Sequence, residues 1–319
     1  MHATKIARTV LALCAFSTAW GQPSPKGPHR LPARLNAPSP ASANTPATGT
    51  HYKFIEIGPP NSPYAVADGI NNSGMVSGYY LDMSSVFHGF AAYGGMFQTV
   101  DYPGASQTLL YGLNNLGVAI GYYTDSSGNN HVVTYTISTG KWGSLPDIPN
   151  YSQNDGYCIN DAGYAVGNAY QGTASAAWIY NPGTSSYSFF TAPAAAPNST
   201  FPSCINSKNE VAGYYVDPSG VYHGFLNAYG SIVTIDVPGA TDTFPDGINN
   251  RGVVEGQIVS SGGALEGYVE NVGGNYAIVN YPGAQATAIV GINEAGDLCG
   301  SEGGTNFANA KAFIAIKQP

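Results

Sequence analysis

The sequence predicts an all-β protein, a six-bladed β-propeller with four-stranded blades that is closed by its N-terminal strand. Three observations predict this fold over residues 51–319. An apolar–Asn pair recurs six times, short strand-like runs alternate with turn signals, and the two ends of the repeat array carry complementary unmatched strands.

The recurring pair is an apolar residue followed by Asn, at spacings of 43, 46, 46, 43 and 44 residues. The six pairs are Ile70-Asn71, Leu113-Asn114, Ile159-Asn160, Ile205-Asn206, Ile248-Asn249 and Ile292-Asn293. Three residues after the Asn stands Gly in five repeats and Asn209 in the fourth, and both residue types tolerate positive φ. We therefore interpret the repeated Asn as a turn-forming residue rather than as a ligand.

Each repeat is predicted to contain four strands, but the array does not begin with a first strand or end with a fourth one. The domain opens with a lone strand of the fourth type at 52–57 and ends on a strand of the third type at 312–316. The last repeat therefore lacks its outer strand, and we expect the N-terminal strand to complete that blade and close the ring. A linear solenoid would instead need polar end caps.

The N-terminal fifty residues predict an exported protein, secreted or periplasmic. Residues 1–21 combine Lys5 and Arg8 with an uncharged run and a small-residue end, as a cleaved signal peptide does. Residues 22–50 contain seven prolines and no aromatic residue, which predicts a disordered linker. No later run reaches the roughly 18–20 apolar residues of a bilayer span, so membrane insertion is not expected.

Charge and cysteine content limit the partners and cross-links. Residues 51–319 carry six basic residues and all nineteen acids of the chain, a formal net charge of −13, which makes nucleic acid a poor partner. Cleavage after residue 21 would leave three cysteines. Cys158 and Cys204 occupy the same position in neighbouring repeats, where either a disulfide or two small buried residues would fit.

Several segments resemble a known repeat family. The stretches 224–226, 234–240 and 246–252 are similar to the bacterial extracellular HAF repeat family, named for its repeat motif. The resemblance covers nearly all of 51–319 and is clearest in repeats one, two and five, whereas repeats three and six depart from it. It implies export from a bacterium and carries no established activity.

One constellation recurs with identical spacing in repeats one, two and four. Its members are Tyr79, Tyr80, Asp82 and His88; Tyr122, Tyr123, Asp125 and His131; and Tyr214, Tyr215, Asp217 and His223. In each, the Asp precedes the His by six residues across the turn between the second and third strands, so the two side chains could meet and orient a sugar hydroxyl beside a Tyr ring. The alternative is that Asp closes its own turn, Tyr fills space between blades and His is a cross-strand neighbour.

Motifs for catalysis and metal binding are absent from the sequence. It contains no Gly-x-Ser-x-Gly, His-Glu-x-x-His or Cys-x-x-Cys, so no catalytic residue is assigned. Asp101 and Asp236 recur before a Pro-Gly pair and read as turn-formers. No cofactor is predicted, although calcium or another divalent metal could be held by ligands from separate loops.

The sequence therefore favours an exported, non-catalytic binding or adhesion propeller for glycans or a surface polymer. The candidate ligand-binding residues are Tyr80, Asp82, His88, Tyr123, Asp125, His131, Tyr215, Asp217 and His223. Threefold recurrence favours binding, because copies of a weak site add avidity. The alternative function is a metal-dependent hydrolase or lactonase in the central channel, and a purely structural scaffold is a third interpretation. The oligomeric state is left open.

Overall fold

A computed structural model of the chain describes residues 51–59, 61–271, 274–304 and 309–318. The predicted signal peptide (1–21) and linker (22–50) lie outside the described residues. Among those that are described, no helix has the length and apolarity needed to cross a membrane.

The described chain forms 24 strands. Repeat one contains β2 (Tyr64–Ile70), β3 (Val76–Leu81), β4 (Phe87–Tyr93) and β5 (Met96–Val100). Repeat two contains β6 (Gln107–Leu113), β7 (Val118–Thr124), β8 (Asn130–Thr136) and β9 (Lys141–Ser144). Repeat three contains β10 (Gln153–Ile159), β11 (Ala165–Gln171), β12 (Ala174–Asn181) and β13 (Ser186–Phe190).

The second half of the chain repeats the pattern. Repeat four contains β14 (Thr200–Ile205), β15 (Val211–Val216), β16 (Tyr222–Ala228) and β17 (Ser231–Thr234). Repeat five contains β18 (Ala240–Ile248), β19 (Val254–Ser260), β20 (Leu265–Asn271) and β21 (Asn275–Ile278). Repeat six contains β22 (Ala286–Ile292), β23 (Leu298–Gly303) and β24 (Lys311–Lys317), and its sheet also includes β1 (Tyr52–Ile57).

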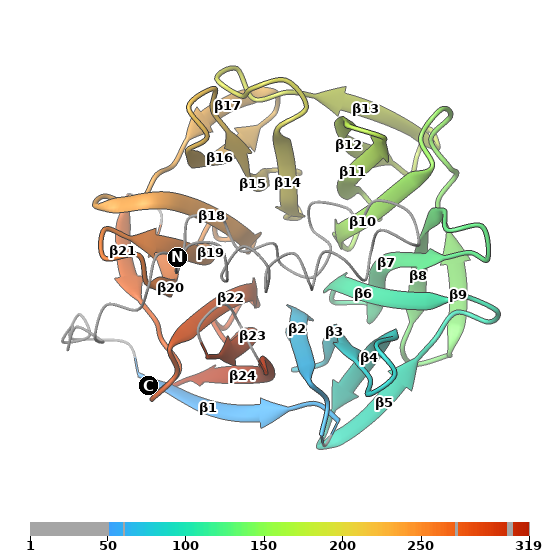
Figure 1. Cartoon of the computed structure of the whole chain (residues 1–319), viewed down its shortest axis with the longest axis horizontal. Coiled ribbons are helices and arrows are strands. Elements are labelled where there is room, and N and C mark those ends of the chain that lie inside the picture. The colour runs from blue at the N-terminus through green and yellow to red at the C-terminus, as the bar shows by residue number, and fades with distance from the viewer. Residues whose placement is uncertain (1–50, 60, 272–273, 305–308, 319) are drawn as a thin grey trace, which may run out of the picture.

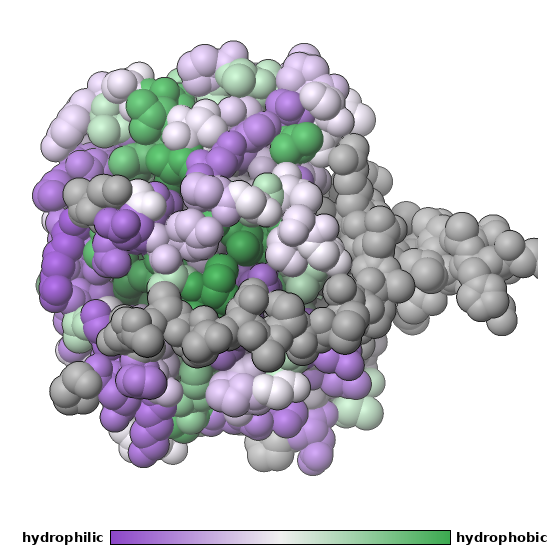
Figure 2. Space-filling model, turned by 90° about the vertical axis from the view of Figure 1, so that its left-hand side faces the viewer, coloured by the Kyte–Doolittle hydropathy of each residue, from purple (hydrophilic) through white to green (hydrophobic). Residues whose placement is uncertain are grey.

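The sheets stand around a common centre, which confirms the all-β propeller fold. Figure 1 shows the first strand of each repeat nearest the centre, with the last strand on the outside. On the side that carries β18–β21, hydrophobic residues are interspersed with hydrophilic ones (Figure 2).

The prediction of six separate blades needs a correction. The structure has four separate four-stranded sheets and one eight-stranded sheet, which contains repeats two and three. The two repeats join where β8 and β10 pair in parallel at Asn130 and Gln153. There, the Asn130 N–H donates to the Ser152 carbonyl (3.1 Å) and Gln153 Nε2 donates to the Gly128 carbonyl (2.9 Å). These contacts bring the start of β10 against the hairpin before β8.

The two ends of the described domain share one sheet. β1 pairs antiparallel with β24 from Tyr52 opposite Lys317 to Ile57 opposite Ala312. Glu56 on β1 also forms an ion pair with Lys311 on β24 (3.3 Å). The first and last strands are therefore held by backbone and side-chain contacts together.

A glycine in the second strand of each repeat has a packing reason. The first strand carries a β-bulge in each repeat, as between Ala67 and Gly69. The bulge places the Val66 carbonyl where a Cβ on Gly78 would stand, and the equivalent glycines of the other repeats meet the same contact: Gly121, Gly167, Gly213, Gly256 and Gly300. Only glycine fits this position, which explains the Val-x-Gly motif.

The repeated Asn residues form a closed ring of hydrogen bonds, which we call the Asn ring: Asn71, Asn114, Asn160, Asn206, Asn249 and Asn293. Each Nδ2 donates to the backbone carbonyl of the Asn in the next repeat, at 2.9–3.2 Å, and Asn293 donates back to Asn71. In repeats one to five, Oδ1 accepts the backbone N–H groups two and four residues later, as at Ser73 and Met75, and Asn293 Oδ1 accepts the N–H of Asp297. The interpretation as turn-formers is therefore correct, and the amide nitrogen additionally ties each repeat to the next.

The cysteines lie at this same end of the molecule. Cys158 and Cys204 form a disulfide between repeats three and four, with their Cα atoms 4.8 Å apart. Both cysteines line an open hollow together with five members of the Asn ring, all except Asn71. The third described cysteine, Cys299, is a buried free thiol.

Candidate functional site

The three predicted constellations lie at the end of the propeller opposite the Asn ring. In repeat one, β2 runs toward the Asn turn, β3 runs back, and the β3–β4 hairpin therefore lies at the other end. The same antiparallel order holds in repeats two and four. Each constellation is thus on the same rim, at the mouth of its hairpin.

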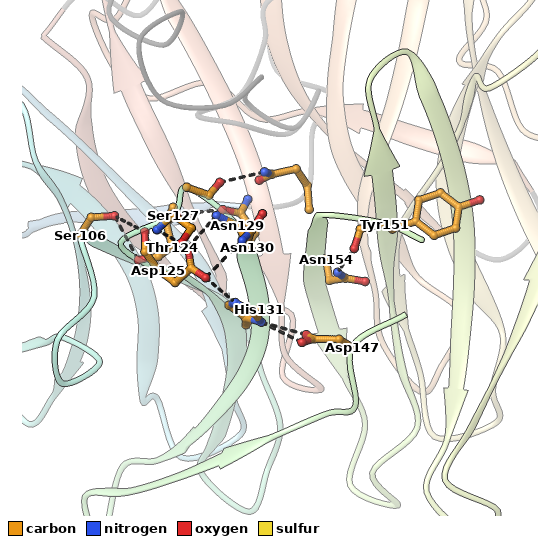
Figure 3. A network of polar contacts seen from close by, with 12 residues as sticks. Ser106, Thr124, Asp125, Ser127, Asn129, Asn130, His131, Asp147, Tyr151 and Asn154 are labelled. Carbon is orange, nitrogen blue, oxygen red and sulfur yellow. Dashed lines mark hydrogen bonds and ion pairs between the residues drawn. The ribbon is translucent and has the colours of Figure 1, made fainter. Parts of the chain in front are cut away.

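In repeat two, His131 lies between two carboxylates (Figure 3). Its Nδ1 is 3.0 Å from Asp147, which lies in the loop after β9, and its Nε2 is 3.2 Å from Oδ2 of Asp125, which lies in the β7–β8 hairpin. The imidazole also stacks on the Tyr123 ring of β7, with centroids 5.0 Å apart and planes 25° apart. The result is an Asp–His–Asp cluster with an aromatic ring along its histidine.

Repeats one and four contain the same Asp–His–Asp cluster. His88 Nδ1 is 2.9 Å from Asp101 and its Nε2 is 3.5 Å from Asp82. His223 Nδ1 is 2.7 Å from Asp236 and its Nε2 is 3.5 Å from Asp217. The stacked tyrosines are Tyr80 and Tyr215, each with centroids 5.2 Å from the histidine and planes at 26° and 24°.

Each hairpin Asp makes two kinds of contact at once. Asp82 Oδ1 accepts the backbone N–H groups of Ser84 and Val86, both at 2.8 Å, so it does close its own turn. Asp125 and Asp217 do the same at 2.8–2.9 Å. Because Oδ1 serves the turn, Oδ2 is the atom that faces the histidine.

The sequence analysis missed the third member of each cluster. Asp101 and Asp236 were interpreted only as turn-formers, and Asp147 was not considered for the site. The signal was present: Asp101 follows His88 by 13 residues, and Asp236 follows His223 by the same number. Asp147 follows His131 by 16 residues, because the turn between β8 and β9 (137–140) is longer than the turn between β4 and β5 (94–95) and Asp147 lies further into the loop after its outer strand.

The tyrosines are less open than expected for sugar-stacking platforms. In repeat two, the second face of Tyr123 is covered by Tyr102, with centroids 3.9 Å apart and planes 4° apart. In repeats one and four, the hydroxyls of Tyr80 and Tyr215 bond to Thr99 and Thr234 on the outer strands. Each tyrosine therefore mainly supports its histidine.

The cluster residues remain partly exposed and electrostatically coupled. In repeat two, the side chains of His131, Asp125 and Asp147 are 25%, 29% and 53% exposed. Burial alone would raise the pKa of Asp125, but the Asn129 backbone N–H and His131 outweigh burial and lower that pKa to about 2. The pKa values of Asp82 and Asp217 are also lowered, first of all by the backbone N–H groups of Val86 and Val221. These carboxylates are therefore ionised at neutral pH.

The other three repeats have different residues at the histidine position. By strand register these are Ala176 in repeat three, Glu266 in repeat five and Lys311 in repeat six. Glu266 accepts a hydrogen bond from Asn280 Nδ2 (3.2 Å), and Lys311 pairs with Glu56. A polar link between the third and fourth strands is thus common, whereas the Asp–His–Asp cluster is specific to repeats one, two and four.

Buried acids near the centre are the other candidate for chemistry. Asp155 is fully buried and accepts a hydrogen bond from Asn130 Nδ2 (2.9 Å), and Asp246 accepts one from Gln257 Nε2 (2.9 Å). Burial, followed by the charge of Asp155, raises the pKa of Tyr122 far above its ordinary value. Within the described ranges, no group of three or more His, Cys, Asp or Glu side chains is arranged to hold a metal ion.

Comparison with known proteins gives the fold and no family. No family model and no curated protein matches the sequence. Among solved structures, TolB from Acinetobacter baumannii is similar with a TM-score of 0.55 at 10% identity, over 76% of this chain and 65% of TolB. This chain thus spans about two thirds of the length of TolB.

Two further solved structures are similar over most of both chains. A gluconolactonase from Xanthomonas campestris has a TM-score of 0.52 at 10% identity, over 84% of this chain and 90% of the other. The lectin SapL1, in complex with alpha methyl fucoside, has a TM-score of 0.52 at 11% identity, over 80% and 95%. At such identities the likeness shows the propeller fold alone, a fold that carries both enzymes and lectins.

Proposed function

We propose that this chain is an exported, non-catalytic binding propeller whose six repeats act as its blades, with those of repeats two and three joined in one eight-stranded sheet. The three Asp–His–Asp clusters on its rim are the sites where it binds a glycan or a surface polymer. One observation carries the proposal: the same cluster geometry recurs in three repeats, each partly exposed and each on the same end of the molecule.

The clusters are not explained by fold maintenance. Their side chains are 22–53% exposed, and exposed ion pairs contribute only about 0–1 kcal/mol to stability. Repeats three, five and six form the same strands with Ala176, Glu266 and Lys311 at the histidine position. The propeller therefore forms its strands without the cluster.

The chemistry of the cluster suits hydroxyl donors. A carboxylate accepts several hydrogen bonds, and His131 and the turn amides occupy only part of this capacity at Asp125 and Asp147. A sugar that presents two neighbouring hydroxyls could bridge the two carboxylates. Three such sites on one rim would bind a repeating polymer more tightly than a single sugar.

The remaining sequence-based predictions fit this function. The signal peptide and linker predicted for residues 1–50 would deliver the propeller to the periplasm or the cell exterior, and membership of the HAF repeat family would agree with that location. Among the solved structures with a similar fold, a lectin bound to a fucoside is a precedent for the proposed activity.

A glycan array with the purified full-length chain tests the proposal. The test variant combines Asp101→Asn, Asp147→Asn and Asp236→Asn, changes that keep the shape of each side chain and remove its charge. Asn280 already occupies this position in repeat five. The matched control combines Glu56→Gln and Glu266→Gln, which alter the polar links outside the clusters. We expect binding to be lost in the test variant and kept in the control, and equal binding by both would overturn the assignment.

The second candidate function is a metal-dependent hydrolase or lactonase in the central channel. The buried carboxylates Asp155 and Asp246, together with a gluconolactonase among the similar folds, favour it over other enzymes. Such an enzyme should retain about one metal ion per chain when purified without chelator. Metal analysis of the full chain, followed by lactone hydrolysis with and without chelator, separates this candidate from the binding propeller.

A further inference from the structure

The histidine in each cluster faces a carboxylate with both of its ring nitrogens. For His131 the two distances are 3.0 Å to Asp147 and 3.2 Å to Asp125. A neutral imidazole carries one N–H, so it can donate to only one of these carboxylates and would present a lone pair to the other. The imidazolium carries two N–H groups and satisfies both. The geometry therefore fits the protonated histidine.

Each cluster joins two loops that belong to different parts of the blade. In repeat two, Asp125 lies in the hairpin between β7 and β8, and Asp147 lies in the loop that leads to repeat three. The histidine between them is on β8. The imidazolium is thus the link that holds the hairpin against the inter-repeat loop, and His223 holds the equivalent loops in repeat four.

We propose that the Asp–His–Asp clusters of repeats two and four are pH-dependent clamps, which hold the rim loops together while the histidine is protonated and release them when it loses its proton. The consequence for ligand binding rests on the proposed function. The two carboxylates of a site keep their spacing only in the clamped form, so ligand affinity falls as pH rises.

The groups that face each imidazole set the direction of this dependence. They are the two carboxylates and the stacked tyrosine: Asp82, Asp101 and Tyr80 for His88; Asp125, Asp147 and Tyr123 for His131; Asp217, Asp236 and Tyr215 for His223. Burial lowers the pKa of His131 and of His223, but the hydrogen bonds and charges of the flanking Asp residues outweigh burial and raise both pKa values above 6.5.

The pH window follows from the directions of these shifts. Because the folded pKa of His131 is raised, its clamp is fully formed below pH 6.5 and weakens as pH rises through the raised pKa. On the acid side, the pKa of Asp125 is lowered from 3.8 to about 2, so its contribution is full above pH 3.8 and is lost as pH falls toward 2. The clamp in repeat two is therefore strongest in mildly acidic solution.

Repeat six carries a lysine where the clusters carry a histidine. Lys311 stands at the histidine position and pairs with Glu56 at 3.3 Å. An ordinary lysine stays charged to about pH 10. The variants His88→Lys, His131→Lys and His223→Lys, made together, therefore replace every cluster histidine with a residue type that is ordinarily charged throughout the range from pH 6 to pH 9.

Nuclear magnetic resonance of the labelled full-length chain tests the clamp without any ligand. We expect both ring nitrogens of His131 and His223 to be protonated at about pH 6, and amide exchange at Val221 to accelerate beyond the intrinsic rate as the histidine titrates. Ala264, whose N–H bonds to Ser260 Oγ in the equivalent turn of repeat five, is the matched control. Neutral imidazoles at pH 6, or equal acceleration at both amides, would overturn the proposal.

The glycan array repeated at two pH values tests the consequence. For the wild-type chain we expect severalfold lower affinity at pH 9 than at pH 6, because His131 and His223, whose pKa values are raised by the flanking carboxylates, lose their protons as pH rises. In the triple lysine variant we expect the ratio of affinities at the two pH values to stay near one, whatever its absolute affinity. A wild-type affinity that does not change with pH contradicts the coupling. If no glycan binds at either pH, the proposed function fails while the resonance measurement still decides the clamp.

Discussion

The two ends of the propeller differ in how uniform their repeats are. At one end, all six repeats carry the same Asn, each 2–6% exposed and each bonded to the next repeat in the Asn ring. At the other end, only repeats one, two and four carry the Asp–His–Asp cluster, with exposed side chains. The Asn residues that all six repeats share link each repeat to the next and so close the ring. The Asp–His–Asp cluster, which only three repeats carry, is not needed for that closure and can serve binding.

The largest effect on stability should come from removing the disulfide at the Asn end. Replacing Cys158 and Cys204 with Ala opens a cross-link that spans 46 residues. A loop of that length corresponds to roughly 4 kcal/mol in the chain-entropy account. Urea unfolding should show this loss, while glycan binding measured below the unfolding transition stays unchanged. Loss of binding without loss of stability would contradict the division between the two ends.

Breaking the Asn ring should have the next largest effect. Asn160→Ala removes two hydrogen bonds donated by Nδ2, to the Asn206 carbonyl and to Asn209 Oδ1, and two accepted by Oδ1. Leaving several of these buried partners unsatisfied should cost about 3 kcal/mol of unfolding free energy. The exposed neighbour Asn72→Ala is the matched control and should cost less than about 1 kcal/mol. Similar losses in the two variants would show that the closed ring contributes nothing special.

A change at the opposite end should separate stability from function. Asp147→Asn removes the charge that faces His131 Nδ1 from a side chain that is 53% exposed. The unfolding free energy should change by less than about 1 kcal/mol, because exposed ion pairs contribute little. The pKa of His131, followed by resonance titration, should fall toward its ordinary value. A loss of several kcal/mol would instead indicate that the cluster maintains the fold.

The smallest effect is expected at the polar link of repeat six. Glu56→Gln removes one charge of its ion pair with Lys311, in which both side chains are about half exposed. Stability should change by about 0–1 kcal/mol and glycan binding should not change. A marked loss of binding in this variant would extend the functional surface beyond the three histidine-containing repeats.

Local chemistry was well predicted from the sequence, because it acts over a few residues. The Asn turns and the Asp residue six positions before each His are determined by contacts between neighbours in a turn or across one hairpin. The phase of the strand types also predicted which strands would be unmatched, and β1 indeed pairs with β24.

Contacts between residues further apart in the sequence depended on register, which the sequence alone did not specify. Asp101 and Asp147 reach their histidines only because the outer strand ends beside them, 13 and 16 residues along the chain. The Asn ring joins each Asn side chain to a backbone carbonyl 43–46 residues away, and the Asn293–Asn71 bond spans 222. The parallel pairing of β8 with β10 depends on one loop conformation.

The sequence by itself therefore determined the repeat, its turns and the pairing of Asp with His in three hairpins, since these follow from spacing and residue type. Only the tertiary structure decided that each histidine would lie between two carboxylates, that the turn-forming Asn would also link the repeats, and that Cys158 would bond to Cys204. The physical reason is that these contacts require several strands to be stacked in register around a common centre, and that stacking is the outcome of folding the whole ring.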